Sequence, residues 1–168
     1  MYGAKYVGRY DGGVPPIESF KIKISEVITK GDWLTFDTTG TTGGKVKVAA
    51  ANVPLLGVAN ETVTGNATGV NKVEVILALP GTKFIMDNDN TTETFAQDDV
   101  GEWHDLTGAT GAMIIDTNVD DSVPSGTAQQ LVCMEYNPQG VCGSIYDDDT
   151  SIGLYVPTYT YFASNYTA

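Results

Sequence analysis

Residues 20–24 read Phe-Lys-Ile-Lys-Ile, with an apolar side chain at every second position. Side chains of a β-strand point alternately to its two faces, so the phenylalanine and the two isoleucines share one face and the lysines share the other. The pattern predicts a strand that is buried on one face. A Lys-Gly-Asp turn at residues 30–32 leads into Trp-Leu-Thr-Phe at residues 33–36, which predicts a second strand joined by a short turn.

Short apolar segments separated by turns continue along the chain. We expect further strands at residues 45–49, 53–58, 70–79, 84–86, 113–115, 131–136 and 141–146. Pro54 and Gly57 predict an edge or kinked strand at 53–58, and the segment 70–79, as the longest candidate, is expected to cross the middle of the sheet. Helix signals are weak, and only one short helical turn is expected, at residues 97–100.

The composition points to one all-β domain. The chain has 168 residues, which fit one hydrophobic core, and its 19 Gly and many Thr, Val, Ile and Tyr favour strands over helices. With 42% hydrophobic and 18% charged residues, the chain is too apolar to be disordered and is low in charge for a monomeric domain. We expect an antiparallel β domain at residues 20–146, an extended N-terminal arm at 1–19 and a C-terminal tail at 147–168.

Both ends of the chain are rich in aromatic residues. The N-terminal aromatics alternate with glycines and a Pro-Pro pair, a composition that predicts no regular element. Large aromatic side chains gain most when they are buried, either against a neighbouring subunit or against the protein's own core, and the sequence leaves both alternatives open. The candidate interface residues are Tyr2, Tyr6, Tyr10, Tyr155, Tyr159, Tyr161, Phe162 and Tyr166.

Charge is divided unevenly along the chain. All nine Lys and Arg lie at or before Lys83, with seven Asp and Glu, which gives this half a net charge of +2. The remainder has fourteen acidic residues and no basic one, a net charge of −14. Such a field repels nucleic acid, so we expect no DNA or RNA partner. The acidic half serves solubility, or it is the exposed face of a protein that is docked on a particle.

The chain has no apolar run of the length that a membrane-spanning helix needs, so we expect no membrane partner. The first residues, MYGAKYVGRYDGG, contain no apolar stretch like that of a secretory signal. We therefore expect synthesis in the cytoplasm.

Catalytic patterns are missing from the sequence. His104 is the only histidine, and the sequence contains no signature of a nucleophile that it could activate. We expect His104 on the surface. The run Gly40-Thr41-Thr42-Gly43-Gly44-Lys45 lacks the spacing of a phosphate-binding loop. We expect no enzymatic activity.

Metal and redox patterns are equally weak. Asp87-Asn88-Asp89-Asn90 begins like a calcium loop, but Thr92 stands where that loop needs glycine, so an exposed hairpin turn is expected and no metal or cofactor. Cys133 and Cys142 flank a turn at residues 137–140. They are either two small buried apolar residues or a disulfide across a hairpin.

The order of strands and turns resembles the cement, or decoration, proteins of tailed-phage capsids. The similarity lies in Val-Ile-Thr-Lys-Gly-Asp-Trp-Leu at residues 27–34, Val-Lys-Val-Ala at 46–49 and Pro-Leu-Leu-Gly-Val-Ala at 54–59. It continues through Val-Glu-Val-Ile-Leu at 73–77 and the stretch at 95–106, and it covers roughly residues 25–136.

This resemblance implies a β-barrel or β-tulip-like domain without catalysis. It implies a partner, the major capsid protein, and self-association as a homotrimer or, less often, a dimer. The location would be the outside of the virion capsid, where the protein bridges capsid subunits and stabilises the shell.

Two other functions are compatible with an all-β chain. The first is a head fibre or spike base that binds host glycans on the faces of Trp33 or Trp103, although a tryptophan in a strand is more often part of the core. The second is a trimeric nucleotide-hydrolysing enzyme, but the metal-binding motifs of such an enzyme are missing from the sequence.

Overall fold

The structure, a computed structural model, describes residues 3–39, 43–89, 96–121, 130–136 and 152–162. The predicted all-β class is confirmed. The helical element of the described residues is the short 3-10 turn η2 (Gln97–Asp99), where one helical turn was expected. No helix in this part of the chain is long and apolar enough to cross a membrane.

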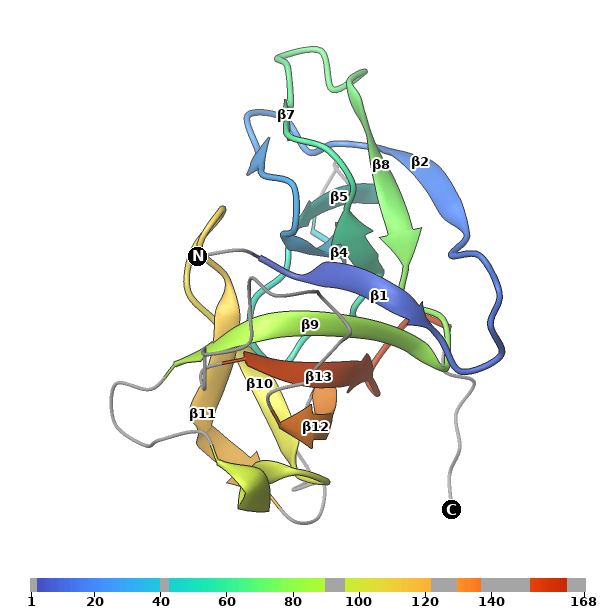
Figure 1. The fold of residues 1–168 in the computed structure, drawn as a ribbon. Coiled ribbons are helices and arrows are strands. Elements are labelled where there is room, and N and C mark those ends of the chain that lie inside the picture. The colour runs from blue at the N-terminus through green and yellow to red at the C-terminus, as the bar shows by residue number, and fades with distance from the viewer. Residues whose placement is uncertain (1–2, 40–42, 90–95, 122–129, 137–151, 163–168) are drawn as a thin grey trace.

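One sheet closes on itself. Its order is β1-β9-β11-β10-β12-β13, and a further pairing of β13 with β9 joins five of the strands into a barrel (Figure 1). β9 pairs with β11 in parallel, whereas the other strand pairs of this sheet are antiparallel. The strands are β1 (Lys5–Arg9), β9 (Thr82–Asp89), β10 (Trp103–Thr107), β11 (Ile114–Asp121), β12 (Leu131–Tyr136) and β13 (Ile152–Pro157).

The second sheet is built from the first half of the chain. Its order is β2-β8-β6-β4-β5, and a bridge between Ile22 and Val46 brings its two edges together. The strands are β2 (Ile17–Lys21), β4 (Trp33–Asp37), β5 (Lys45–Val48), β6 (Gly57–Ala59) and β8 (Lys72–Leu77). A small pair, β3 (Val27–Ile28) with β7 (Val63–Thr64), lies beside this sheet.

Two strand expectations need correction. The segment 53–58 was expected at an edge, but β6 lies between β8 and β4, because Pro54 precedes the strand and takes no part in its ladder. Glycine at position 57 lets the strands approach, since a Cβ there would lie 2.1 Å from the carbonyl oxygen of Ile76. The segment 70–79 is not the longest strand, because β9 and β11 have eight residues and β8 has six.

The expected arm and tail contribute strands. β1 and most of β2 fall within residues 1–19, so the expectation of no regular element there is wrong. Glycine 8, with φ of 151°, falls at a bulge in the pairing of β1 with β9, which is how a glycine-rich sequence still makes a strand. β13 falls within residues 147–168 and pairs with both β9 and β12. The expected strand at 141–146 lies outside the described residues.

The two sheets share one core. Trp33 and Val58 of the second sheet pack in the same buried cluster as Phe84, Met86 and Tyr155 of the barrel. A second cluster lines the other face of the second sheet. It contains Ile22, Leu34, Val46, Leu56, Val73 and Val75, so the apolar face predicted from residues 20–24 is confirmed at Ile22, while Ile24 is 41% exposed.

A buried amide ties the sheets together. The Gln130 side chain donates to the carbonyl oxygens of Ala50 and Val53, both at 2.8 Å, and accepts from the Leu106 N–H at 3.1 Å. Residues 50–53 lie between β5 and β6, whereas Leu106 lies on β10. This one side chain therefore joins a connection of the second sheet to the barrel.

Candidate functional site

The expected C-terminal interface aromatics pack largely on the protein itself. Tyr155 is fully buried, its hydroxyl donates to Asn88 Oδ1, and its ring meets His104 edge-on at 5.9 Å between centroids. Burial raises the pKa of Tyr155. The sequence left a neighbouring subunit or the own core as partner of this side chain, and the structure places it in the core.

The residues after β13 lie against the second sheet. The Tyr159 carbonyl accepts from the Leu55 N–H at 2.8 Å. The Tyr161 ring packs edge-on against Phe36 at 4.9 Å between centroids. Phe162 packs against the second core cluster, so these aromatic residues cover the second sheet of the same chain. Tyr2 and Tyr166 lie outside the described residues.

The N-terminal aromatics divide into one inward and one outward residue. Tyr6 on β1 is half-buried and packs edge-on against Phe84, with centroids 6.1 Å apart. Tyr10, just after β1, is 59% exposed, and Lys83 Nζ lies 4.9 Å from the centre of its ring. Of the described candidate residues, Tyr10 is therefore the one most available to a partner.

Tyr10 belongs to an exposed apolar segment that we call the 10–17 segment. In it, Val14 is 87% exposed and Ile17 is 46% exposed. Exposed apolar groups that lie close together are typical of interaction surfaces. Val14 and Ile17 were not among the candidates drawn from the sequence, although Val-Pro-Pro-Ile at residues 14–17 is a signal, since it places apolar residues on a chain that prolines hold extended.

Local hydrogen bonds shape the start of this segment. The Arg9 guanidinium donates to both carboxylate oxygens of Asp11, at 3.0 and 2.8 Å, and the Gly13 N–H donates to Asp11 at 2.9 Å. The Arg9 hydrogen bond lowers the pKa of the Asp11 carboxyl, and it raises the pKa of Arg9. The Arg9–Asp11 ion pair and the Gly13 hydrogen bond thus stabilise the turn that precedes Val14.

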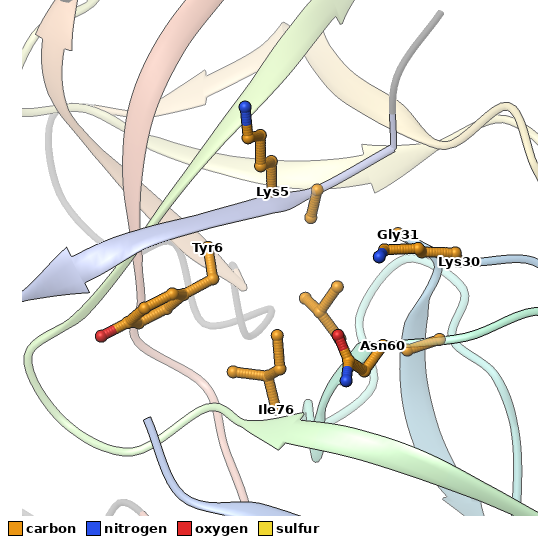
Figure 2. Close-up of a pocket in the computed structure, with 9 residues that line it drawn as sticks. Lys5, Tyr6, Lys30, Gly31, Asn60 and Ile76 are labelled. Atoms are coloured by element: carbon orange, nitrogen blue, oxygen red, sulfur yellow. The ribbon is translucent and has the colours of Figure 1, made fainter. Parts of the chain in front are cut away.

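A groove of about 500 Å³ lies next to the 10–17 segment, between β1 and strands β6 and β8 (Figure 2). The Tyr6 hydroxyl, on one wall of the groove, donates to the Gly13 carbonyl at 3.3 Å, which links the groove to the segment. Figure 2 shows Tyr6 and Ile76 on opposite sides of the opening, with Asn60 near Gly31. The lining residues are Ala4, Lys5, Tyr6, Lys30, Gly31, Val58, Ala59, Asn60 and Ile76.

The basic and acidic residues lie largely on different elements of the fold. All nine Lys and Arg lie on β1, on the second sheet and its connections, or near the start of β9. On the barrel, the exposed charges of η2 and β12 are acidic, as with Asp98 and Glu135. The residues that line the groove and those of the 10–17 segment therefore all come from the half of the chain that carries the Lys and Arg residues.

Two predicted polar positions are placed differently by the structure. His104 was expected on the surface but is fully buried, because β10 is a barrel strand and this side chain points inward against Tyr155. Asp87 to Asp89 were expected in an exposed turn but lie in β9, where Asn88 is 6% exposed. Among the described residues, no three His, Cys, Asp or Glu side chains are grouped so as to hold a metal ion.

The remaining sequence candidates are buried or partly buried. Trp33 is fully buried and its indole N–H donates to Met86 Sδ at 2.9 Å, so it offers no face to a glycan. Trp103 is partly buried. Cys133 is buried, and burial raises the pKa of its thiol to about 12, as expected of a small apolar core residue; Cys142 lies outside the described residues.

Comparisons with known proteins identify no relative: no protein-family model, no curated protein and no solved structure matches this chain.

Proposed function

We propose that this protein is a structural virion protein that binds the outside of a phage capsid, bridges major capsid subunits and stabilises the shell. The observation that carries the proposal is the exposed apolar 10–17 segment, which belongs to the half of the chain that carries all nine Lys and Arg. The resemblance in strand order to capsid cement proteins supplies the identity of the partner. In this proposal the protein is not an enzyme.

The 10–17 segment supplies the anchor. Tyr10 and Val14 are 59% and 87% exposed, so their burial against a partner removes apolar surface that water covers in the free protein. Burying a side chain of this kind contributes about 1.5–3 kcal/mol, and aromatic residues are frequent among the residues that dominate interface energies. Prolines 15 and 16 limit the backbone freedom of the segment, which lowers the entropic cost of docking.

In this proposal the charge distribution of the protein sets its orientation on the capsid. With the basic half toward the shell, the barrel with its net negative surface faces solvent, where it keeps the decorated particle soluble. Binding to the assembled lattice alone stabilises that lattice by mass action, and repetition around the shell strengthens weak contacts through avidity. Self-association as a homotrimer, which the resemblance implies, would add contacts at each site.

Co-sedimentation with expanded empty capsids tests this proposal. Wild type is expected to bind saturably at a fixed ratio to the major capsid protein. The variant Val14→Asp, which places a charge in the 10–17 segment, is expected to bind at least tenfold more weakly. Val70→Asp is the matched control, since Val70 is 60% exposed but lies outside that segment, and it is expected to bind like wild type.

Absence of binding to expanded capsids would overturn the proposal. Equal loss of binding in both variants would overturn the assignment of the 10–17 segment, because a general effect of added charge would then explain the result. Light scattering of the purified protein measures its oligomeric state in the absence of capsids, and a trimer is expected.

A further inference from the structure

β1 has an open edge. It lies at the end of the strand order, and within the described residues no strand pairs with its second edge. The Ala4 N–H donates to the Gly31 carbonyl on that side, at 2.8 Å. Because amides two residues apart in an extended chain point to the same edge, the Tyr6 N–H points toward the groove as well.

The groove runs along this open edge. Val58 and Ile76 give it an apolar wall from the second sheet, and Tyr6 gives the opposite wall from β1. A volume of about 500 Å³ beside an unpaired strand edge is the setting in which an extended peptide adds as a further strand. Backbone hydrogen bonds then supply affinity, and the apolar wall receives alternate side chains of the peptide.

The mouth of the groove carries positive charge. Lys5 and Lys30 line it, and both are exposed. In Figure 2 the Lys5 side chain extends away from Ile76 and Asn60, so its amine stands outside the apolar part of the groove. Two carboxylates of the described residues lie next to the lining residue Asn60 without lining the groove themselves: Glu74 accepts from Asn60 Nδ2 at 3.1 Å, and Glu61 accepts from the Glu74 N–H at 3.0 Å. The charges favour a peptide with acidic side chains between apolar ones.

We propose that the groove beside β1 accepts an extended acidic segment of the major capsid protein, which pairs with the open edge of β1. This inference rests on the proposed function, because that function supplies the partner. The groove adjoins the 10–17 segment through the Tyr6–Gly13 hydrogen bond, so the two form one continuous docking surface. The segment anchors the protein, and the groove selects the chain that it binds.

A peptide titration tests the groove without a capsid. The probe is the capped peptide Glu-Val-Glu-Val-Glu, titrated into the ¹⁵N-labelled full-length protein, with Lys-Val-Lys-Val-Lys as the control peptide. The acidic peptide is expected to shift the amide resonance of Tyr6 and those of residues 58–60. Lys30→Glu is expected to weaken its binding roughly fivefold, whereas Lys72→Glu, the same change at an exposed lysine outside the groove, leaves it unchanged.

A second pair of variants tests whether the peptide has to occupy the groove in order to bind. Ile76→Trp fills the groove and is expected to abolish binding of the acidic peptide. Val27→Trp is the matched control, because Val27 is 51% exposed on β3 and lies outside both the groove and the 10–17 segment, and it is expected to retain binding. Equal binding of the two peptides, or unchanged binding by Ile76→Trp, overturns the groove assignment.

Hydrogen exchange of the capsid-bound protein separates this inference from the proposed function. Slower exchange of the Tyr6 amide on capsids than in free protein is the expected result. Saturable capsid binding without protection of this amide overturns the groove and leaves the proposed function intact. Failure to bind capsids, together with normal peptide binding, overturns the proposed function and shows that another acidic partner uses the groove.

Discussion

Replacing Gln130 with leucine tests whether one buried amide holds the two sheets together. A leucine side chain has a shape similar to that of glutamine, and the change removes the three hydrogen bonds of the Gln130 side chain. The Leu106 N–H is left unpaired in a buried position, which costs about 2 kcal/mol. The carbonyls of Ala50 and Val53 lie nearer the surface, where water replaces part of the lost bonding, and each adds about 0.5–1 kcal/mol.

The expected loss is therefore about 3–4 kcal/mol of unfolding free energy, a large fraction of what a domain of this size has. Urea unfolding followed by circular dichroism measures it, and with a slope of about 2 kcal/mol per molar urea the midpoint falls by about 1.5–2 M. Gln97→Leu is the matched control, because Gln97 is exposed on η2 and its replacement should change stability by less than about 0.5 kcal/mol. A shift for Gln130→Leu no larger than that of the control would refute the role of this amide.

Three further predictions concern buried groups. Iodoacetamide at pH 8 is expected to leave Cys133 unmodified in the native protein and to label it in urea, because the thiol is buried with a pKa of about 12; mass spectrometry showing rapid native labelling would contradict this. Burial raises the pKa of Asp32 and Asp105, so their contribution to stability is full below the unfolded value of 3.8 and is lost as the pH rises through the raised folded values. The double variant Asp32→Asn, Asp105→Asn should therefore lose less stability than wild type between pH 4 and pH 7 in urea titrations, and parallel curves would count against this explanation. Trp33→Phe is expected to cost about 2 kcal/mol, because the indole is fully buried against Phe84 and donates to a sulfur, and a loss below about 0.5 kcal/mol in thermal unfolding would show that this packing is not needed.

Local patterns in the sequence were sufficient to identify the fold class and many strands. The turn at Gly31 and the apolar run at residues 84–86 each depend on neighbours in sequence, and each has its counterpart in the structure, whereas the strand expected at residues 20–24 lies three residues earlier, as β2 (Ile17–Lys21). The burial of Trp33 also followed from its place in a strand.

Long-range pairing could not be predicted in this way. β1 joins the six-stranded sheet only because it pairs with β9, more than seventy positions later in the chain, and β13 closes the barrel only through its pairings with β9 and β12. The sequence shows that both ends are aromatic. Aromatic side chains suit an interface and the protein's own core equally well, so the sequence did not distinguish these two locations. The closure of the barrel places Tyr155 inside, whereas Tyr10, just after β1, stays exposed.

The proposed docking surface could likewise be predicted from the sequence only in part. Val14 and Ile17 are ordinary apolar residues in the sequence; in the structure Val14 follows the turn that Arg9 and Asp11 hold, and Ile17 lies on the mostly exposed edge strand β2. The groove combines residues of β1, β6 and β8, so no single stretch of sequence contains it. The segregation of basic and acidic residues along the chain, by contrast, was fully visible in the sequence.

The orientation of the protein on a capsid tests the central claim most directly. Electron cryomicroscopy of expanded capsids saturated with the protein is expected to show it on the outer surface, with the 10–17 segment and the groove beside β1 against capsid subunits and the barrel with η2 facing solvent. Bound protein with its acidic barrel against the shell, or capsids that carry no added density at saturating concentration, would contradict the account.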